Sequence, residues 1–219
     1  MRVVGATVAL VLALVGSLVD GPAAVAQTAA SPLWLTVEET ESLVRRIDYE
    51  GMPRAEAERI GPAGAARLVE MLADPAERTH HARVLLALGT CGAPGALEAI
   101  RAWAASAPRA GELDRARFRA WQMLPHALGR LASHDPRAVE ELVARFDAGP
   151  PAWTFRHFRG NRLQRLERRA AVSALGESDR PEAARALEGL MRRGLDPELA
   201  DHVRAARAAM AVPTTGGTR

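Results

Sequence analysis

The sequence predicts an all-α protein, an α-α superhelix (solenoid) of about four helical hairpins spanning residues 36–211. The first observation is a recurring tripeptide, Ala-Leu-Gly, found at 87–89, 127–129 and 174–176. Its copies start 40 and 47 residues apart, in or near the range of two-helix repeats. A proline follows each copy after a short interval, at Pro94, Pro136 and Pro181. Apolar residues between these markers recur at steps of three and four, and strand-type alternation is absent, so helices are expected throughout.

The N-terminal segment has the layout of a secretory signal peptide. Met1-Arg2 gives a positive start, and an uncharged apolar run follows from Val3 to Val19. Asp20-Gly21-Pro22 ends this run, and Ala24-Val25-Ala26 offers the small residues that a signal peptidase requires. We therefore expect a signal peptide over 1–26, cleaved after Ala26, and export to the periplasm or outside the cell. The alternative is an uncleaved N-terminal membrane anchor.

Capping signals predict where the folded region begins. Residues 27–35 are expected to be a linker, followed by a capping helix over 36–48. Thr36 and Glu39 have the spacing of a capping box, as do Asp74 and Glu77. Residues 212–219 are expected to form a disordered tail.

Each hairpin is predicted to consist of a helix, a glycine-containing turn and a helix that a proline opens. The glycine of Ala-Leu-Gly suits a helix C-cap, and proline suits the first helical position, where its missing N–H costs nothing. An aspartate precedes a proline at Asp74, Asp135 and Asp196, where its side chain can cap a helix. Pro125 falls inside an apolar helical run, so a kink is expected near Leu124.

These residues resemble the HEAT-like repeat superfamily, including its phycobilisome-lyase-type members. Arg168–Gly176 matches the family's Arg-x-x-Ala-x-x-Ala-Leu-Gly helix best, and Asp74-Pro75 followed by 82–89 matches moderately. The middle copy, 124–129, departs most from the pattern. The resemblance covers about residues 55–211 and implies an armadillo-type α-α superhelix, but it does not indicate a function.

Composition excludes several kinds of chemistry. All 29 basic residues are arginine, so mechanisms that need a lysine are excluded, including Schiff-base catalysis and the P-loop. The single cysteine, Cys91, permits no internal disulfide and is predicted to be a buried small hydrophobe, with a reactive or dimerising thiol as the alternative. His80 and His81 cannot share a helix face as metal ligands and are expected to be surface or capping residues. No catalytic, cofactor-binding or metal-binding residue is therefore predicted.

One segment has a local signature of its own, residues 152–169, in which arginines alternate with aromatic residues. The segment contains six arginines and only one carboxylate residue, Glu167. Guanidinium groups bond anions bidentately, and aromatic rings add stacking surfaces. The candidate partner-binding residues are Trp153, Phe155, Arg156, Phe158, Arg159, Arg162 and Arg165. In the alternative interpretation, the aromatic residues pin a long loop to the core while the arginines line a solvated helix face.

Together these features predict an exported, non-catalytic module that binds or scaffolds other proteins in a bacterial-type cell envelope. Its partner is expected to be a protein with an acidic surface; anionic glycans or lipid head groups are alternatives, ahead of nucleic acid. The rival hypothesis is an enzyme or a small-molecule sensor with a pocket on the concave face of the repeats. A deep apolar pocket with converging polar groups favours the rival, and a broad charged groove favours the binding module.

Overall fold

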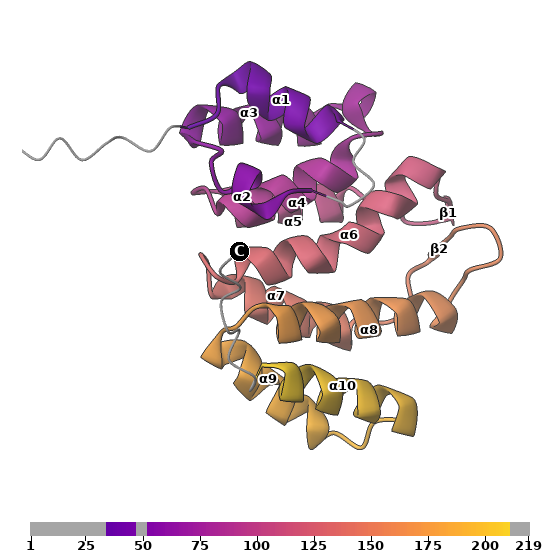
Figure 1. Cartoon of the computed structure of the whole chain (residues 1–219). Helices are drawn as coiled ribbons and strands as arrows, with labels where there is room; N and C mark the ends of the chain where they lie inside the picture. The colour runs from indigo at the N-terminus through magenta and orange to yellow at the C-terminus, as the bar shows by residue number, and fades with distance from the viewer. Residues whose placement is uncertain (1–33, 47–51, 211–219) are drawn as a thin grey trace, which may run out of the picture. The chain divides into compact units, whose positions relative to one another are not determined.

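The computed structural model describes residues 34–46 and 52–210, all of which belong to the unit Pro32–Arg219 (Figure 1). In these ranges the chain forms ten α-helices, one 3-10 turn and two strands of two residues, which confirms the all-α class. The predicted signal peptide over 1–26 and the predicted tail over 212–219 lie outside the described residues. Among the described helices, none combines the length and apolar character needed to cross a bilayer.

The helices follow one another with short connections. Their bounds are α1 Val37–Arg45, α2 Arg54–Ala57, α3 Pro62–Ala73, α4 His81–Cys91, α5 Ala96–Ala105, α6 Arg115–Leu131, α7 Arg137–Asp147, α8 Asn161–Glu177, α9 Pro181–Met191 and α10 Pro197–Ala209, with the 3-10 turn η1 over Pro75–Glu77. Strand β1, Gly111–Glu112, pairs in parallel with β2, Trp153–Thr154, so that Gly111 lies opposite Trp153. This small ladder was not predicted, because two-residue strands have no alternation to detect.

Alternate helices pack against one another along the chain. Helices α4, α6, α8 and α10 contact each other in that order, and α3 contacts α5 as α7 contacts α9 (Figure 1). One continuous apolar core runs between these helices. Its largest fully buried side chains are Leu68, Met71, Leu85, Leu88, Leu97, Ile100, Leu124, Leu128, Leu131, Leu142, Leu163 and Leu175.

The glycines of the three Ala-Leu-Gly copies are not C-caps, and that prediction is wrong. Gly89, Gly129 and Gly176 lie inside α4, α6 and α8, each with one or more helical residues after it. A Cβ atom on Gly129 would come within 2.7 Å of the backbone oxygen of Ala174. A Cβ on Gly89 would come even closer to the backbone oxygen of Ala127. The glycine of one copy therefore packs against the alanine of the next, and the missing side chain permits a close approach of α4 to α6 and of α6 to α8.

Helix starts follow the predicted caps in part. The capping box of α1 is confirmed, since Thr36 Oγ1 accepts the Glu39 N–H at 3.1 Å and Glu39 accepts the Thr36 N–H at 2.8 Å. This helix ends at Arg45, short of the predicted 48, and residues 47 and 48 lie outside the described residues. Asp196 caps α10 as predicted, through the N–H of Leu199. Asp74 instead caps the 3-10 turn, because its side chain accepts the N–H of Ala76 rather than that of Glu77.

Of the three marker prolines, only Pro181 occupies the first turn at N1. Pro136 is the N-cap residue of α7, and Pro94 precedes Gly95, the N-cap residue of α5. Gly95 has φ +83°, a conformation that favours glycine. Pro125 lies inside α6, which continues to Leu131, and the expected kink stays a prediction.

The end of the predicted linker is ordered against the helices. The N–H of Leu35 donates to the carbonyl of Arg59 at 2.8 Å, forming a bridge with Ile60.

Cys91 is half-buried, and burial raises the pKa of its thiol, which fits the predicted small apolar residue better than a reactive one.

Candidate functional site

The aromatic residues of segment 152–169 pack inward. The side chain of Trp153 is 5% exposed, and its ring meets Trp121 edge-on with centroids 4.9 Å apart. The Phe155 ring stacks on that of Phe118 in α6, with centroids 3.9 Å apart and planes 9° apart. Phe158 is also half-buried against this group. Trp153 is thus too deeply buried to touch a partner, and the rings fasten the segment to α6.

Backbone hydrogen bonds fix the same segment. Phe155 and Phe158 bond each other through both main-chain groups, at 3.0 and 2.8 Å, which closes a tight turn around Arg156 and His157. Arg156 takes φ +50° in this turn, and its N–H donates to Oε1 of Glu112 at 2.9 Å. The β1–β2 ladder adds a bond from the N–H of Leu113 to the carbonyl of Thr154, at 2.8 Å. The turn therefore has a defined place on the fold.

The arginines of the segment point outward. Arg156, Arg159, Arg162 and Arg165 are all exposed. The guanidinium of Arg162 lies 4.3 Å from the centroid of Phe158, and that of Arg156 lies 5.4 Å from the centroid of Phe155. No carboxylate in the described part of the chain pairs with any of these four guanidinium groups.

The remaining charges of the segment are taken up within the fold. Glu167 is buried and pairs with Arg145 at 2.9 Å, while Arg169 pairs with Glu198 at 2.7 Å. Arg168 donates to the carbonyl of Phe146 at 3.0 Å. Burial raises the pKa of Glu167, and Arg145 opposes this shift. We call the four outward groups, Arg156, Arg159, Arg162 and Arg165, the arginine face.

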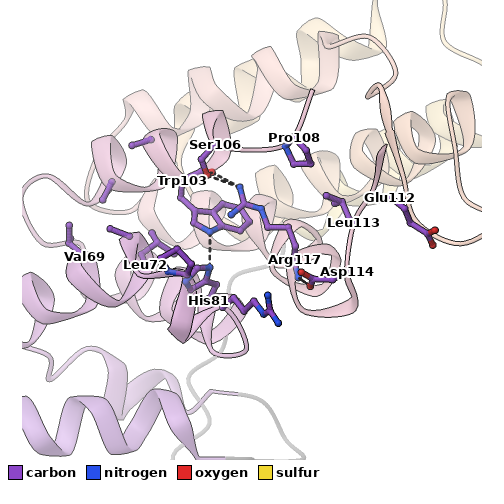
Figure 2. A pocket seen from close by; sticks show the side chains of 15 residues that line it. Val69, Leu72, His81, Trp103, Ser106, Pro108, Glu112, Leu113, Asp114 and Arg117 are labelled. Carbon is purple, nitrogen blue, oxygen red and sulfur yellow. Dashed lines mark hydrogen bonds between the residues drawn. The ribbon is translucent and has the colours of Figure 1, made fainter. Parts of the chain in front are cut away.

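A second candidate site lies away from that segment, in a pocket of about 700 Å³ (Figure 2). Pockets of this size hold drug-sized ligands. Its walls are mainly apolar and come from α3, α5 and the stretch that leads into α6. Val69 contributes an apolar side chain that is 38% exposed. Sequence reasoning missed this pocket because its residues come from separate helices and share no local motif.

Three polar side chains meet at one wall of this pocket. The indole N–H of Trp103 donates to Nδ1 of His81 at 3.0 Å. With Nδ1 as the acceptor, Nε2 of His81 carries the proton, and it lies 3.1 Å from the carbonyl oxygens of both Met71 and Asp74. Figure 2 shows the indole directed at His81, with Arg117 beside the same ring. The expectation that His81 is a surface or capping residue is wrong, since it is 4% exposed.

Arg117 is stacked on the indole of Trp103, with its guanidinium carbon 3.9 Å from the ring centroid. One of its terminal nitrogens donates to the carbonyl of Trp103 at 2.8 Å and to the hydroxyl of Ser106 at 2.9 Å. Both acceptors are neutral, and in the described residues no carboxylate forms an ion pair with this guanidinium. Burial lowers the pKa of Arg117, and the negative charge of Asp114 opposes this shift. Burial also lowers the pKa of His81, which is therefore held in its neutral form.

Two carboxylates and a second arginine line the rim of the pocket. Asp114 is the N-cap of α6, and its Oδ1 accepts the main-chain N–H of Arg117 at 2.8 Å. Glu112 accepts the main-chain N–H of Arg156, and Figure 2 shows its carboxylate directed away from Trp103. Arg78 is exposed and has no ion-pair partner in the described ranges. The carboxylates of the rim thus accept main-chain N–H groups, and neither forms an ion pair with Arg117 or Arg78 in the described chain.

The polar side chains of the pocket supply hydrogen-bonding and stacking groups. Among the described residues, no group of three or more histidine, cysteine, aspartate or glutamate side chains is placed to hold a metal ion. The ring nitrogens of His81 are both engaged, so it holds Trp103 in place.

Comparisons of the chain with protein-family models, with curated proteins and with solved structures find no match.

Proposed function

We propose that this chain is an exported, non-catalytic binding module that holds an acidic protein partner on its arginine face. The observation that carries the proposal is the set of four exposed guanidinium groups, without a carboxylate partner in the described chain, on a segment that the core holds in place. A preorganised cationic surface loses less entropy on binding than a mobile one. Arginine also suits carboxylates, because its planar fork bonds them bidentately.

The fold supports a binding role of this kind. The contacts of α4, α6, α8 and α10 in chain order support a stack of HEAT-like hairpins in an α-α superhelix, because each repeat of such a stack contacts only its neighbours. Such repeats commonly present an extended surface to another chain. The proposed partner contacts are the arginines alone. Trp153, Phe155 and Phe158 serve as anchors of the segment, in line with the loop-anchor alternative.

Export rests on the N-terminal sequence. The charge, apolar run, breaker and small residues of 1–26 support cleavage after Ala26. N-terminal sequencing of the protein recovered from the periplasm or the medium should start at Gln27. An intact Met1 in the membrane fraction would show an anchor instead.

Binding to a fluorescent poly-glutamate peptide, followed by anisotropy at increasing salt, tests the arginine face. Affinity should fall steeply with ionic strength, because exposed charge pairs are screened over about 8 Å at physiological salt. A triple variant, Arg156→Glu, Arg159→Glu and Arg162→Glu, should abolish binding and retain the helical circular dichroism spectrum.

The matched control changes three exposed arginines elsewhere, Arg115→Glu, Arg119→Glu and Arg192→Glu, with the same change in net charge. It should retain most of the affinity if the arginine face is a specific site. If both triple variants bind equally weakly, binding reflects net charge alone. If the first triple variant binds as the parent does, the proposed function is wrong.

A further inference from the structure

The pocket at Trp103 contains a cation that forms no ion pair in the described chain, although the charge of the nearby Asp114 carboxylate acts on it. The guanidinium of Arg117 is half-buried, stacked on an indole and bonded only to neutral acceptors. Its Nε and second terminal nitrogen have no acceptor in the described chain and are not fully buried. A buried charge is normally paired, because leaving water is costly. Nη2 uses both of its hydrogens on Trp103 and Ser106, so Nε and Nη1, which point to different sides of the guanidinium, can each donate to one oxygen of an anionic acceptor.

The rest of the pocket is suited to an apolar body. Leu72 and Leu113 form its walls, together with Trp103, and Val69, which also lines it, exposes more than a third of its surface. Exposed large apolar side chains are few in the described chain, the others being Trp34 and Met191. Covering apolar surface contributes about 25 cal/mol for each Å² removed from water. An apolar group seated beside the charged one would therefore add affinity.

We propose that this pocket binds a small amphipathic carboxylate, an aliphatic or aryl-alkyl acid of medium length. Its carboxylate accepts from Arg117, and its apolar chain lies along Trp103, Leu72 and Val69. Asp114 and Glu112 stay at the rim on their main-chain donors, and Arg78 adds a second positive charge there. His81 is a positioning residue, because its acceptor nitrogen fixes the indole on which both Arg117 and the ligand rest.

Titration calorimetry of the full chain with octanoate tests the proposal. Octanoate should bind with a saturable isotherm, and octanamide, which has the same chain but no charge, should bind about tenfold or more weakly, since hydrogen bonds to charged groups are the stronger ones. Acetate should bind far more weakly than octanoate. Equal affinity for octanoate and octanamide, equal affinity for acetate, or no saturable octanoate binding would overturn the proposal.

Variants locate the ligand. Arg117→Gln should weaken octanoate binding about tenfold or more. Arg119→Gln, on the same helix but exposed, should leave it unchanged. Arg117 also bonds Ser106, so Arg117→Gln could disturb the fold there. A second pair of variants therefore tests octanoate binding independently at Val69, an exposed residue of the pocket wall. Val69→Glu should weaken octanoate binding and Val69→Lys should not. Octanoate binding that is unaffected by both Arg117→Gln and Val69→Glu places the ligand elsewhere and refutes the site.

This pocket and the arginine face can be tested apart. The triple glutamate variant of the arginine face should still bind octanoate, and Arg117→Gln should still bind poly-glutamate. If each of these variants loses both octanoate and poly-glutamate binding, the pocket and the arginine face are not separate sites.

Discussion

Replacing Gly89 with alanine tests whether the Ala-Leu-Gly glycines set the helix spacing. An added Cβ would lie 2.8 Å from the carbonyl carbon of Ala127 and closer still to its oxygen. Ordinary contacts between carbon atoms are about 3.5–4.0 Å, so α4 and α6 would have to move apart by roughly 0.7 Å or more. The obstacle is backbone, which cannot rotate away as a side chain can.

The magnitude is the difference between two opposing effects. Overpacking a well-packed interface costs about 1–3 kcal/mol, and a rigid backbone neighbour belongs at the upper end. Alanine gains about 1 kcal/mol over glycine inside a helix. The net loss is therefore about 2 kcal/mol, or roughly 4–8 °C in melting temperature for a chain of this size. Urea denaturation followed by circular dichroism at 222 nm measures it directly.

Two other glycines provide internal controls. At Gly176 the added Cβ would lie 3.0 Å from the Cβ of Ala206 on α10, a milder contact that should cost less. Gly149 lies in a connection where an added Cβ meets nothing within 4 Å, so Gly149→Ala should be neutral or stabilising by up to about 1 kcal/mol. If Gly89→Ala is as stable as Gly149→Ala, close packing at the tripeptide does not set the helix spacing and the reasoning fails.

Three further predictions concern the core, the anchor and His81. Leu175→Ala should lower the free energy of unfolding by about 2–5 kcal/mol, because Leu175 is fully buried. Met191→Ala, at an exposed site, should change the free energy of unfolding by no more than about 0.5 kcal/mol. A urea midpoint that Leu175→Ala leaves unchanged would contradict the proposed repeat packing. Phe155→Ala should cost about 1–3 kcal/mol by thermal denaturation, through loss of its stack on Phe118, and an unchanged melting temperature would show that the ring is not an anchor. Burial lowers the pKa of His81 in the folded protein. As the pH falls, His81 therefore becomes protonated in the unfolded chain before it does so in the folded one. The free energy of unfolding should fall as the pH drops below about 6.5 toward the folded-state pKa. His81→Gln should flatten that part of the pH profile in urea titrations and His80→Gln should not; an identical slope in both variants would refute the assignment.

The helices could be predicted from sequence because their signals are local. The capping box at Thr36 and the cap at Asp196 act within one turn, and the structure contains both. The glycines of Ala-Leu-Gly were misinterpreted for a physical reason. A C-cap and a close helix contact both need a residue without Cβ, and only the partner helix decides between them. At Gly89 that partner is Ala127, almost forty residues further along the chain.

The two candidate sites differ in the same way. The arginine face is predictable because its members are close in sequence, whereas the burial of Trp153 depends on its contact with Trp121 of α6. The Trp103 pocket joins residues from several helices, and sequence spacing does not reveal that His81 faces an indole. One signal was available, since a buried tryptophan usually gives its N–H to an acceptor.

The β1–β2 ladder has a consequence for how the two sites respond to each other. Glu112 lines the Trp103 pocket and also holds the main chain of Arg156 in the arginine face. The N–H of Leu113 and the N–H of Arg156 are both bonded across this ladder, so we expect the two amides to open together. Hydrogen exchange at these two amides should slow in parallel when octanoate occupies the pocket. The same two amides should slow again when an acidic peptide occupies the arginine face, so that each ligand is detectable from the other's site.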